Sequence, residues 1–143
     1  MKKSSVAVII VAAGTGSRAG SGALPRQYQL LAGQPLLRRT LEAVLAHADI
    51  GPVQVVIGQD HDEFYEKGVE GLKAPVLLSP VVGGDTRQKS GLAGLETFAK
   101  AKADLRPQKV LIHDAARPFL SGALLDRIIA TLDEHAGAVP VLA

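Results

Sequence analysis

The chain has 143 residues, of which 16 are basic and 14 acidic, and its net charge is +2 with the histidines neutral. Hydrophobic residues make up 47% of it, aromatic residues 3%, and there is no cysteine. This composition excludes a disordered chain, a disulfide scaffold, a thiolate metal site and a cysteine nucleophile. A charge of +2 is too small to argue for nucleic acid. The longest apolar run, 6–13, is far shorter than the ~20 residues of a membrane span. We therefore expect a cytoplasmic single domain with no nucleic-acid or membrane partner.

Strand-like and helix-like segments alternate along the chain. Continuous apolar runs predict buried parallel strands, and apolar residues at helical spacing predict the helices between them. The expected strands are 6–12, 53–57, 74–78 and 109–113, with another beginning at 138–143, and the expected helices are 35–45, 60–71, 87–102 and 121–137. This alternation predicts an α/β fold, a Rossmann-like and mostly parallel sheet with helices on both faces. We expect this sheet to be C-terminally incomplete, because the chain stops inside a strand-like run.

Local signals add finer expectations about the helices. Asp60 with Glu63 predicts a capping box at the start of the second helix, and Ser121 predicts the N-cap of the last one. The apolar positions 92, 95 and 98 predict the inner face of the third helix. His113 closes a strand, where we expect a structural hydrogen-bond donor rather than a catalytic base.

Three unusual segments follow predicted strands, at 12–26, 83–90 and 114–118. Parallel sheets bind their ligands at the carboxyl ends of the strands. We therefore expect these three segments to converge on one binding site.

The first of these segments reads A-A-G-T-G-S-R-A-G at 12–20. Glycines after a strand allow backbone N–H groups to approach a phosphate closely. Gly14, Gly16 and Ala19 fit G-x-G-x-x-A, but the acid that a dinucleotide site needs about 20 positions on is missing, and no G-K-S/T follows. Arg18 suits a triphosphate, whose charge needs neutralising. The alternative is an ordinary strand–helix turn.

The other segments add charged residues, each with a simpler alternative. Arg26 follows a proline just beyond the first loop, and alone it would be read as a surface arginine. Asp85 follows two glycines, where it could serve only as a helix N-cap. Asp114 ends a strand, where an acid is a natural ligand for a magnesium ion that carries phosphates. The simpler reading of Asp114 is an Asp–Arg surface pair.

Taken together, these segments resemble the cytidylyltransferases of isoprenoid biosynthesis, specifically the 2-C-methyl-D-erythritol 4-phosphate cytidylyltransferase family. The matching motifs are A-A-G-x-G-x-R at 12–18, P-[K/R]-Q-Y at 25–28, G-G-D-x-R-x-x-S at 83–90 and H-D-A-A-R-P at 113–118. The resemblance implies transfer of CMP from CTP to 2-C-methyl-D-erythritol 4-phosphate, with release of pyrophosphate, in the non-mevalonate pathway. It implies Mg²⁺ as cofactor and a homodimer for the full-length protein. Residues 1–143 would then be the nucleotide-binding part of a cytidylyltransferase domain.

The resemblance also implies which residues bind the nucleotide. Gly14 and Gly16 would give backbone contacts to the triphosphate. The pocket for cytosine and ribose would be formed by Ala12, Ala13, Gly84, Asp85 and Ser90.

Further residues are implied to act on the reacting groups. Arg18 and Arg26 would be catalytic, stabilising charge on the α-phosphate and pyrophosphate. Asp114 would lie near the magnesium ion and the α-phosphate, with Ala115 against the ribose. Arg117 would touch the polyol phosphate.

The sequence departs from the family pattern at three places. Arg26 stands where the family usually has lysine, which keeps the charge but changes its shape. Gly91 stands where a β-branched residue is preferred, which weakens the helix by about 1 kcal/mol. The family also continues well past position 143 with substrate-binding residues and a dimer arm, and some members are fused to a cyclodiphosphate synthase.

Alternatives remain open from the sequence. One is ribitol-5-phosphate cytidylyltransferase, and another is a nucleotidyltransferase for sugars or a molybdenum cofactor. A third is a truncated fragment that binds CTP without turnover. A dinucleotide-dependent dehydrogenase is the last.

Overall fold

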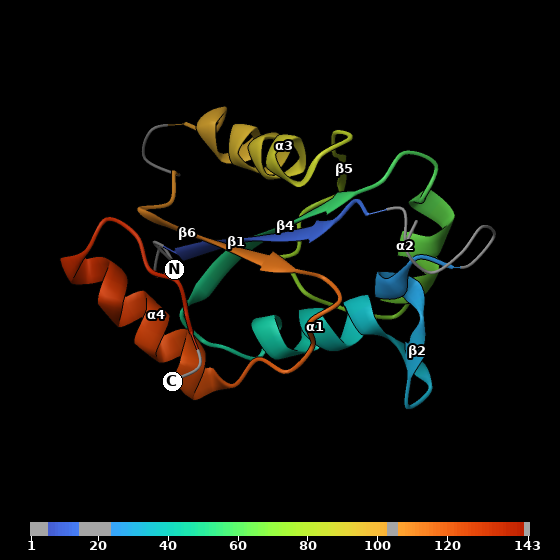
Figure 1. Cartoon of the computed structure of the whole chain (residues 1–143), viewed down its shortest axis with the longest axis horizontal. Coiled ribbons are helices and arrows are strands. Elements are labelled where there is room, and N and C mark those ends of the chain that lie inside the picture. Colours follow the sequence, from blue (N-terminus) through green and yellow to red (C-terminus); the bar gives the residue numbers. More distant parts are fainter. Residues whose placement is uncertain (1–5, 15–23, 103–105, 142–143) are drawn as a thin grey trace.

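The computed structural model describes residues 6–14, 24–102 and 106–141. Four parallel strands form one sheet in the order β5-β4-β1-β6. They are β1 (Val6–Ala12), β4 (Ile50–Ile57), β5 (Val81–Val82) and β6 (Lys109–Asp114). Figure 1 shows α3 (Arg87–Ala99) on one face of this sheet and α1 (Leu36–Leu45) with α4 (Gly122–Glu134) on the other. The expected α/β fold is confirmed. None of the helices in the described ranges is long and apolar enough to cross a membrane.

Strand β1 is central and buried on both faces. Its alternate side chains enter two cores: Val8 and Ile10 pack in the cluster that contains Leu37 of α1, and Ile9 packs in the cluster that contains Phe98 of α3. Full burial of each large apolar side chain contributes about 1.5–3 kcal/mol. This two-sided burial explains why β1 is a continuous apolar run rather than an alternating one.

Helix α1 places a buried stripe against the sheet. The stripe consists of Leu37, Thr40, Leu41 and Val44, at helical spacing. The Thr40 hydroxyl lies 2.7 Å from the carbonyl oxygen of Ala115, to which it donates, so α1 is tied to the segment after β6. Just past the end of α1, His47 Nε2 lies 2.6 Å from Asp126 Oδ1, which joins α1 to α4.

Helix α2 (Asp62–Val69) begins without the expected capping box. Its N-cap residue is His61, and no side chain caps it. Asp60 has a φ of 65°, a left-handed conformation that turns the chain after β4. The prediction of a cap by Asp60 and Glu63 is therefore wrong, because an N-cap residue usually has extended backbone.

The edge strand lies later in the chain than expected. Segment 74–78 makes only an isolated bridge, between Leu77 and Val53, and is not a strand. The strand is β5, in the stretch between the expected strand 74–78 and the expected helix 87–102, and it pairs with β4 after Pro80. A proline has no N–H for the ladder, so pairing is interrupted there.

Helix α3 meets the sheet through small residues, which the apolar pattern did not predict. Leu92 and Leu95 are 54% and 39% exposed, so two of the three expected inner positions are wrong. Phe98 is buried as expected. The buried side consists of Ser90, Gly91, Gly94 and Phe98. A Cβ on Gly94 would lie 2.7 Å from Ile9 Cγ2, so this glycine is what allows α3 to approach β1.

The last helix begins where the sequence predicted, but several other features of the fold differ from the prediction or were not predicted. Ser121 caps α4 as expected, accepting a hydrogen bond from Leu124 N at 3.1 Å. The helix ends at Glu134, and residues 138–141 form no strand, so the strand expected there is not present in these residues. A 3₁₀ turn η2 (Arg26–Tyr28) and a hairpin of β2 (Leu30–Leu31) and β3 (Gln34–Pro35) were not predicted.

Candidate active site

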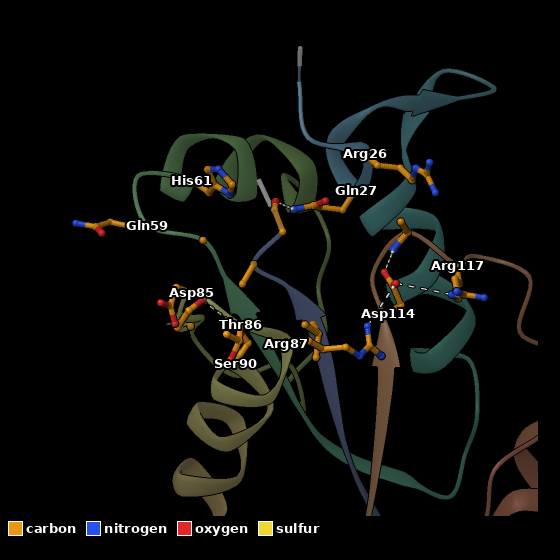
Figure 2. A pocket seen from close by; sticks show the side chains of 17 residues that line it. Arg26, Gln27, Gln59, His61, Asp85, Thr86, Arg87, Ser90, Asp114 and Arg117 are labelled. Carbon is orange, nitrogen blue, oxygen red and sulfur yellow. Dashed lines mark hydrogen bonds and ion pairs between the residues drawn. The ribbon is translucent and has the colours of Figure 1, made fainter. Parts of the chain in front are cut away.

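A cleft of about 960 Å³ lies at the carboxyl end of the sheet. Figure 2 shows the side chains that line it, which come from the end of β1, from η2, from the segment after β4, from 83–90 and from 114–117. The described parts of the three segments that the sequence singled out are therefore brought together, joined by Gly58, Gln59 and His61.

Most of the predicted site residues line this cleft. They are Ala13, Gly14, Arg26, Gly84, Asp85, Ser90, Asp114 and Arg117. Ala12 and Ala115 are fully buried and do not line it; Ala116 reaches it instead. Gly16 and Arg18 lie outside the described residues.

Asp114 is held at the end of β6 by its neighbours. Its Oδ1 accepts a hydrogen bond from Ala116 N at 2.9 Å. Its Oδ2 lies 3.5 Å from Arg87 Nη1 and 3.7 Å from Arg117 Nε, so the Asp–Arg pair considered from the sequence is present within the cleft. Mg²⁺ is usually held by one or two carboxylates together with substrate phosphates. This half-buried carboxylate therefore fits a magnesium–nucleotide site.

The turn after β6 is fixed through its backbone. Ala115 N donates to Val11 O at 3.0 Å, and Ala115 O accepts from Thr40. His113 Nε2 lies 2.7 Å from the Arg117 carbonyl, to which it donates, which confirms the structural role expected for this histidine. The turn that carries Asp114 and Arg117 is thus rigidly attached to β1 and α1.

At Gly83 and Gly84, just before α3, the backbone lies too close to its neighbours for a side chain to fit. A Cβ on Gly83 would lie 2.5 Å from Ser90 Oγ and 2.8 Å from Val56 Cγ1. The Ser90 hydroxyl donates to the Gly84 carbonyl at 3.3 Å. These close approaches bring the start of α3 against the end of the sheet.

The N-cap of α3 is Thr86, whose Oγ1 accepts from Lys89 N at 3.1 Å. Asp85 is therefore not the cap, and that alternative is wrong. The Asp85 carboxylate is exposed and lies 2.8 Å from Lys89 Nζ. Asp85 remains available to a ligand in the cleft.

Several lining residues were not proposed from the sequence: Gln27, Gln59, His61, Thr86 and Arg87. His61 packs its ring at 5.7 Å from that of Tyr28 and 5.6 Å from that of Phe64, and a Cβ on Gly58 would be 2.6 Å from its Nδ1. The sequence gives no signal for this contact, because it depends on how α2 folds over the end of β4. Arg87 and Thr86 did stand inside a quoted motif, at positions given no role.

Burial raises the pKa of the Tyr28 phenol well above its ordinary value, and the nearby Tyr65 and Asp62 raise it further. Its Oη has no hydrogen-bond partner in the described part of the chain. Burial also raises the pKa of Tyr65. Both phenols are therefore neutral at physiological pH, and they pack in the core cluster that contains Leu37 of α1.

Residues 6–143 match the family model of 2-C-methyl-D-erythritol 4-phosphate cytidylyltransferase (IspD). The chain belongs to this family. Family membership confirms the resemblance on which the sequence motifs agreed. The IspD match also contains all four sequence motifs whose described residues meet at the cleft.

Relatives agree with this assignment. The bifunctional enzyme IspD/IspF of Rhodospirillum rubrum is 48% identical over 138 residues, which are 96% of this chain and 34% of that protein. The enzyme of the same name from Rhizorhabdus wittichii is 48% identical over 141 residues, 99% of this chain and 34% of that one. The chain thus spans about a third of the length of these relatives.

Solved structures show the same fold. The 4-diphosphocytidyl-2C-methyl-D-erythritol synthase of Anaerococcus prevotii superposes with a TM-score of 0.68 at 28% identity, over 90% of this chain and 51% of that one. A second structure of a synthase of that name gives a TM-score of 0.73 at 25% identity, over 95% and 57%. The IspD fold is therefore recognisable in this chain alone.

Proposed function

We propose that the protein transfers CMP from CTP to 2-C-methyl-D-erythritol 4-phosphate and releases pyrophosphate. The observation that carries the proposal is the meeting, in one cleft, of Arg26, the Gly84–Ser90 segment and the Asp114–Arg117 turn. The cleft therefore offers cations and two carboxylates next to a compact glycine-lined wall. Such a set suits a substrate with a base at one end and phosphates at the other.

The proposed reaction needs no general base. An oxygen of the polyol phosphate attacks the α-phosphorus of CTP, and the bond from that phosphorus to the bridging oxygen of pyrophosphate breaks. A phosphate monoester has its second pKa near 6, so the nucleophile is mostly dianionic at neutral pH. The protein has instead to hold two anions in line and to neutralise the charge that gathers between them.

Arginines are the groups suited to that work. Figure 2 shows Arg26 and Arg117 on the same side of the cleft as Asp114, and Arg87 between Ser90 and Asp114. Each guanidinium can donate two parallel hydrogen bonds to phosphate oxygens. Arg18 remains a predicted catalytic residue on the sequence motif alone.

The base and ribose are assigned to the other end of the cleft. Gly84 and Ser90 form a tight corner there, and Asp85 is exposed beside it. Ala13 and Gly14 supply backbone at the end of β1. This division leaves the arginines and Asp114 for the phosphates.

Magnesium is part of the proposal. Asp114 would hold the ion, with the phosphates of CTP as its other ligands. Its chemistry there is to neutralise phosphate oxygens. A cytoplasmic location, a homodimer for the full-length protein and the absence of nucleic-acid or membrane partners also belong to the proposal, supported by the sequence motifs and the small net charge.

The test is a calorimetric titration of the chain with CTP and Mg²⁺, with ATP, GTP and NAD⁺ as controls. We expect saturable binding of CTP and none of the controls at the same concentration. Preference for GTP or NAD⁺ would overturn the assignment. A pyrophosphate-release assay with 2-C-methyl-D-erythritol 4-phosphate and ribitol 5-phosphate then separates the two polyol phosphates. Binding of CTP without release identifies a nucleotide-binding fragment.

A further inference from the structure

The carboxamide of Gln27 lies between residues 12–14, at the end of β1, and the turn η2, which carries Arg26. Its Nε2 donates to the Ala12 carbonyl at 2.8 Å and to the Gly14 carbonyl at 2.9 Å. Gln27 is 6% exposed, and both protons of its amide are used. Figure 2 shows the Gln27 side chain reaching from η2 to the end of β1.

These two hydrogen bonds fix the direction of the backbone in the loop. In a trans peptide, the carbonyl and the following N–H point in opposite directions. A fixed Ala12 carbonyl therefore fixes the direction of the Ala13 N–H. Among the described residues, no atom beyond its chain neighbours lies within 4 Å of where a Cβ of Gly14 would stand, so none of their side chains packs against this glycine. The amide of Gln27 supplies the constraint instead.

The turn η2 is anchored on its other side by Tyr28. Tyr28 N donates to Pro25 O at 2.9 Å, and the ring is 3% exposed, with its centroid 5.3 Å from that of Phe64. Arg26 itself is exposed to the cleft. The position of Arg26 relative to the Gly14 loop therefore depends on the residue beside it, Gln27.

We propose that Gln27 is a positioning residue that sets Arg26 against the phosphate-binding loop. It does not touch the reacting atoms; it acts through Arg26 and through the carbonyls of Ala12 and Gly14. The inference rests on the proposed function, because it takes the Gly14 loop to bind the triphosphate.

The test replaces Gln27 by glutamate, which has the same length but no N–H donors at neutral pH and repels the two carbonyl oxygens. The matched control is Gln29→Glu. Gln29 lies directly after the same turn and donates one exposed hydrogen bond, to Leu24 O at 2.9 Å. We expect Gln27→Glu to weaken binding of CTP with Mg²⁺ by about tenfold, the effect of losing two backbone contacts, and Gln29→Glu to leave it unchanged.

A double-mutant cycle separates positioning from general destabilisation. On an Arg26→Ala background, Gln27→Glu should cost less CTP affinity than it does in the wild type, because only its effect through the Ala12 and Gly14 carbonyls remains. If the two losses simply add, Gln27 does not act through Arg26 and the proposal is wrong.

Amide hydrogen exchange tests the constraint without any nucleotide. Gln27→Glu should speed exchange at both 12–14 and 26–28, and Gln29→Glu should not. Unchanged exchange in Gln27→Glu would overturn the proposal even if CTP binds. If the wild type shows no preference for CTP, the proposed function fails, and the exchange experiment still decides whether Gln27 holds the two segments.

Discussion

Arg87 Nη1 lies 3.5 Å from Asp114 Oδ2, so the first residue of α3 faces the last residue of β6 across the cleft. The Arg87 side chain is 63% exposed, and an exposed pair of this kind contributes only about 0–1 kcal/mol to stability. The pair matters for the charge of the site instead, because two guanidinium groups lie beside Asp114 at the place where we expect a phosphate-bound cation.

Replacing Asp114 by asparagine should therefore weaken ligand binding and spare the fold. The Asn oxygen can still accept from Ala116 N, so we expect a change in unfolding free energy of less than about 0.5 kcal/mol. We expect the affinity for CTP in the presence of Mg²⁺ to fall by about tenfold or more, because a negative ligand is lost. Calorimetry over a magnesium titration measures this. Asp133→Asn is the control, because Asp133, on α4, pairs with Lys109 at the start of β6, and neither residue lines the cleft. Equal affinities for both variants would make Asp114 purely structural.

Replacing Thr86 should lower the stability of the fold, whereas replacing Asp85 should lower the affinity for CTP. Thr86→Ala removes the N-cap of α3 and should cost about 1 kcal/mol of unfolding free energy. Asp85→Asn removes only an exposed ion pair with Lys89, so its stability should stay close to that of the wild type while CTP affinity falls. Urea unfolding and calorimetry on both variants give the comparison. A loss of stability in Asp85→Asn as large as in Thr86→Ala would contradict this division.

Two glycines of α3 should respond oppositely to alanine. Within the part of the chain that the structure describes, a Cβ at Gly91 would meet nothing within 4 Å, so Gly91→Ala should stabilise the helix by about 0.5–1 kcal/mol. A Cβ at Gly94 would lie 2.7 Å from Ile9 Cγ2 in the core, so Gly94→Ala should destabilise by about 1–3 kcal/mol. Chemical denaturation of both variants measures the pair. Stabilisation of both would show that α3 can move away from β1 without loss.

The raised pKa of Tyr28 predicts a loss of stability at alkaline pH. The unfolded phenol ionises near its ordinary value of 10, whereas the folded one keeps its proton at higher pH. The contribution is therefore complete below about pH 10 and is lost as the pH rises toward the folded pKa. Tyr28→Phe should flatten the decline above about pH 10, and it removes a hydroxyl with no partner in the described residues.

Urea titrations at several pH values check this prediction. The sequence holds two tyrosines, so a Tyr65→Phe variant serves as the comparison. An unchanged alkaline decline in Tyr28→Phe would show that the phenol gains access to water in the folded state.

The strand-and-helix order could be predicted because burial leaves a local pattern. The continuous apolar run of β1 predicts a strand that is buried on both faces. The spacing of Leu37, Leu41 and Val44 predicts a helix that is buried on one face. Where the local pattern gave a wrong prediction of burial, a tertiary contact determined which residues are buried. Leu92 looked like a core residue, yet it is exposed because Gly94 lets α3 approach Ile9 along a different side.

The candidate site divides in the same way. Glycine and charge at strand ends located the cleft, because parallel strands bring their carboxyl ends to one edge. The sequence could not say that Ala116 rather than Ala115 lines it. That depends on Thr40 and Val11 binding the backbone of Ala115 from other elements.

The sequence by itself determined the α/β fold, the segments that carry the site and the family, because these depend on periodicity and on motifs read along the chain. The tertiary structure decided which atoms the side chains of the site contact. Gln27 meets the Ala12 and Gly14 carbonyls, and Arg87 meets Asp114, through elements that are distant in sequence. Such contacts leave no periodic trace, because packing of the elements, not the local backbone preference, brings the atoms together.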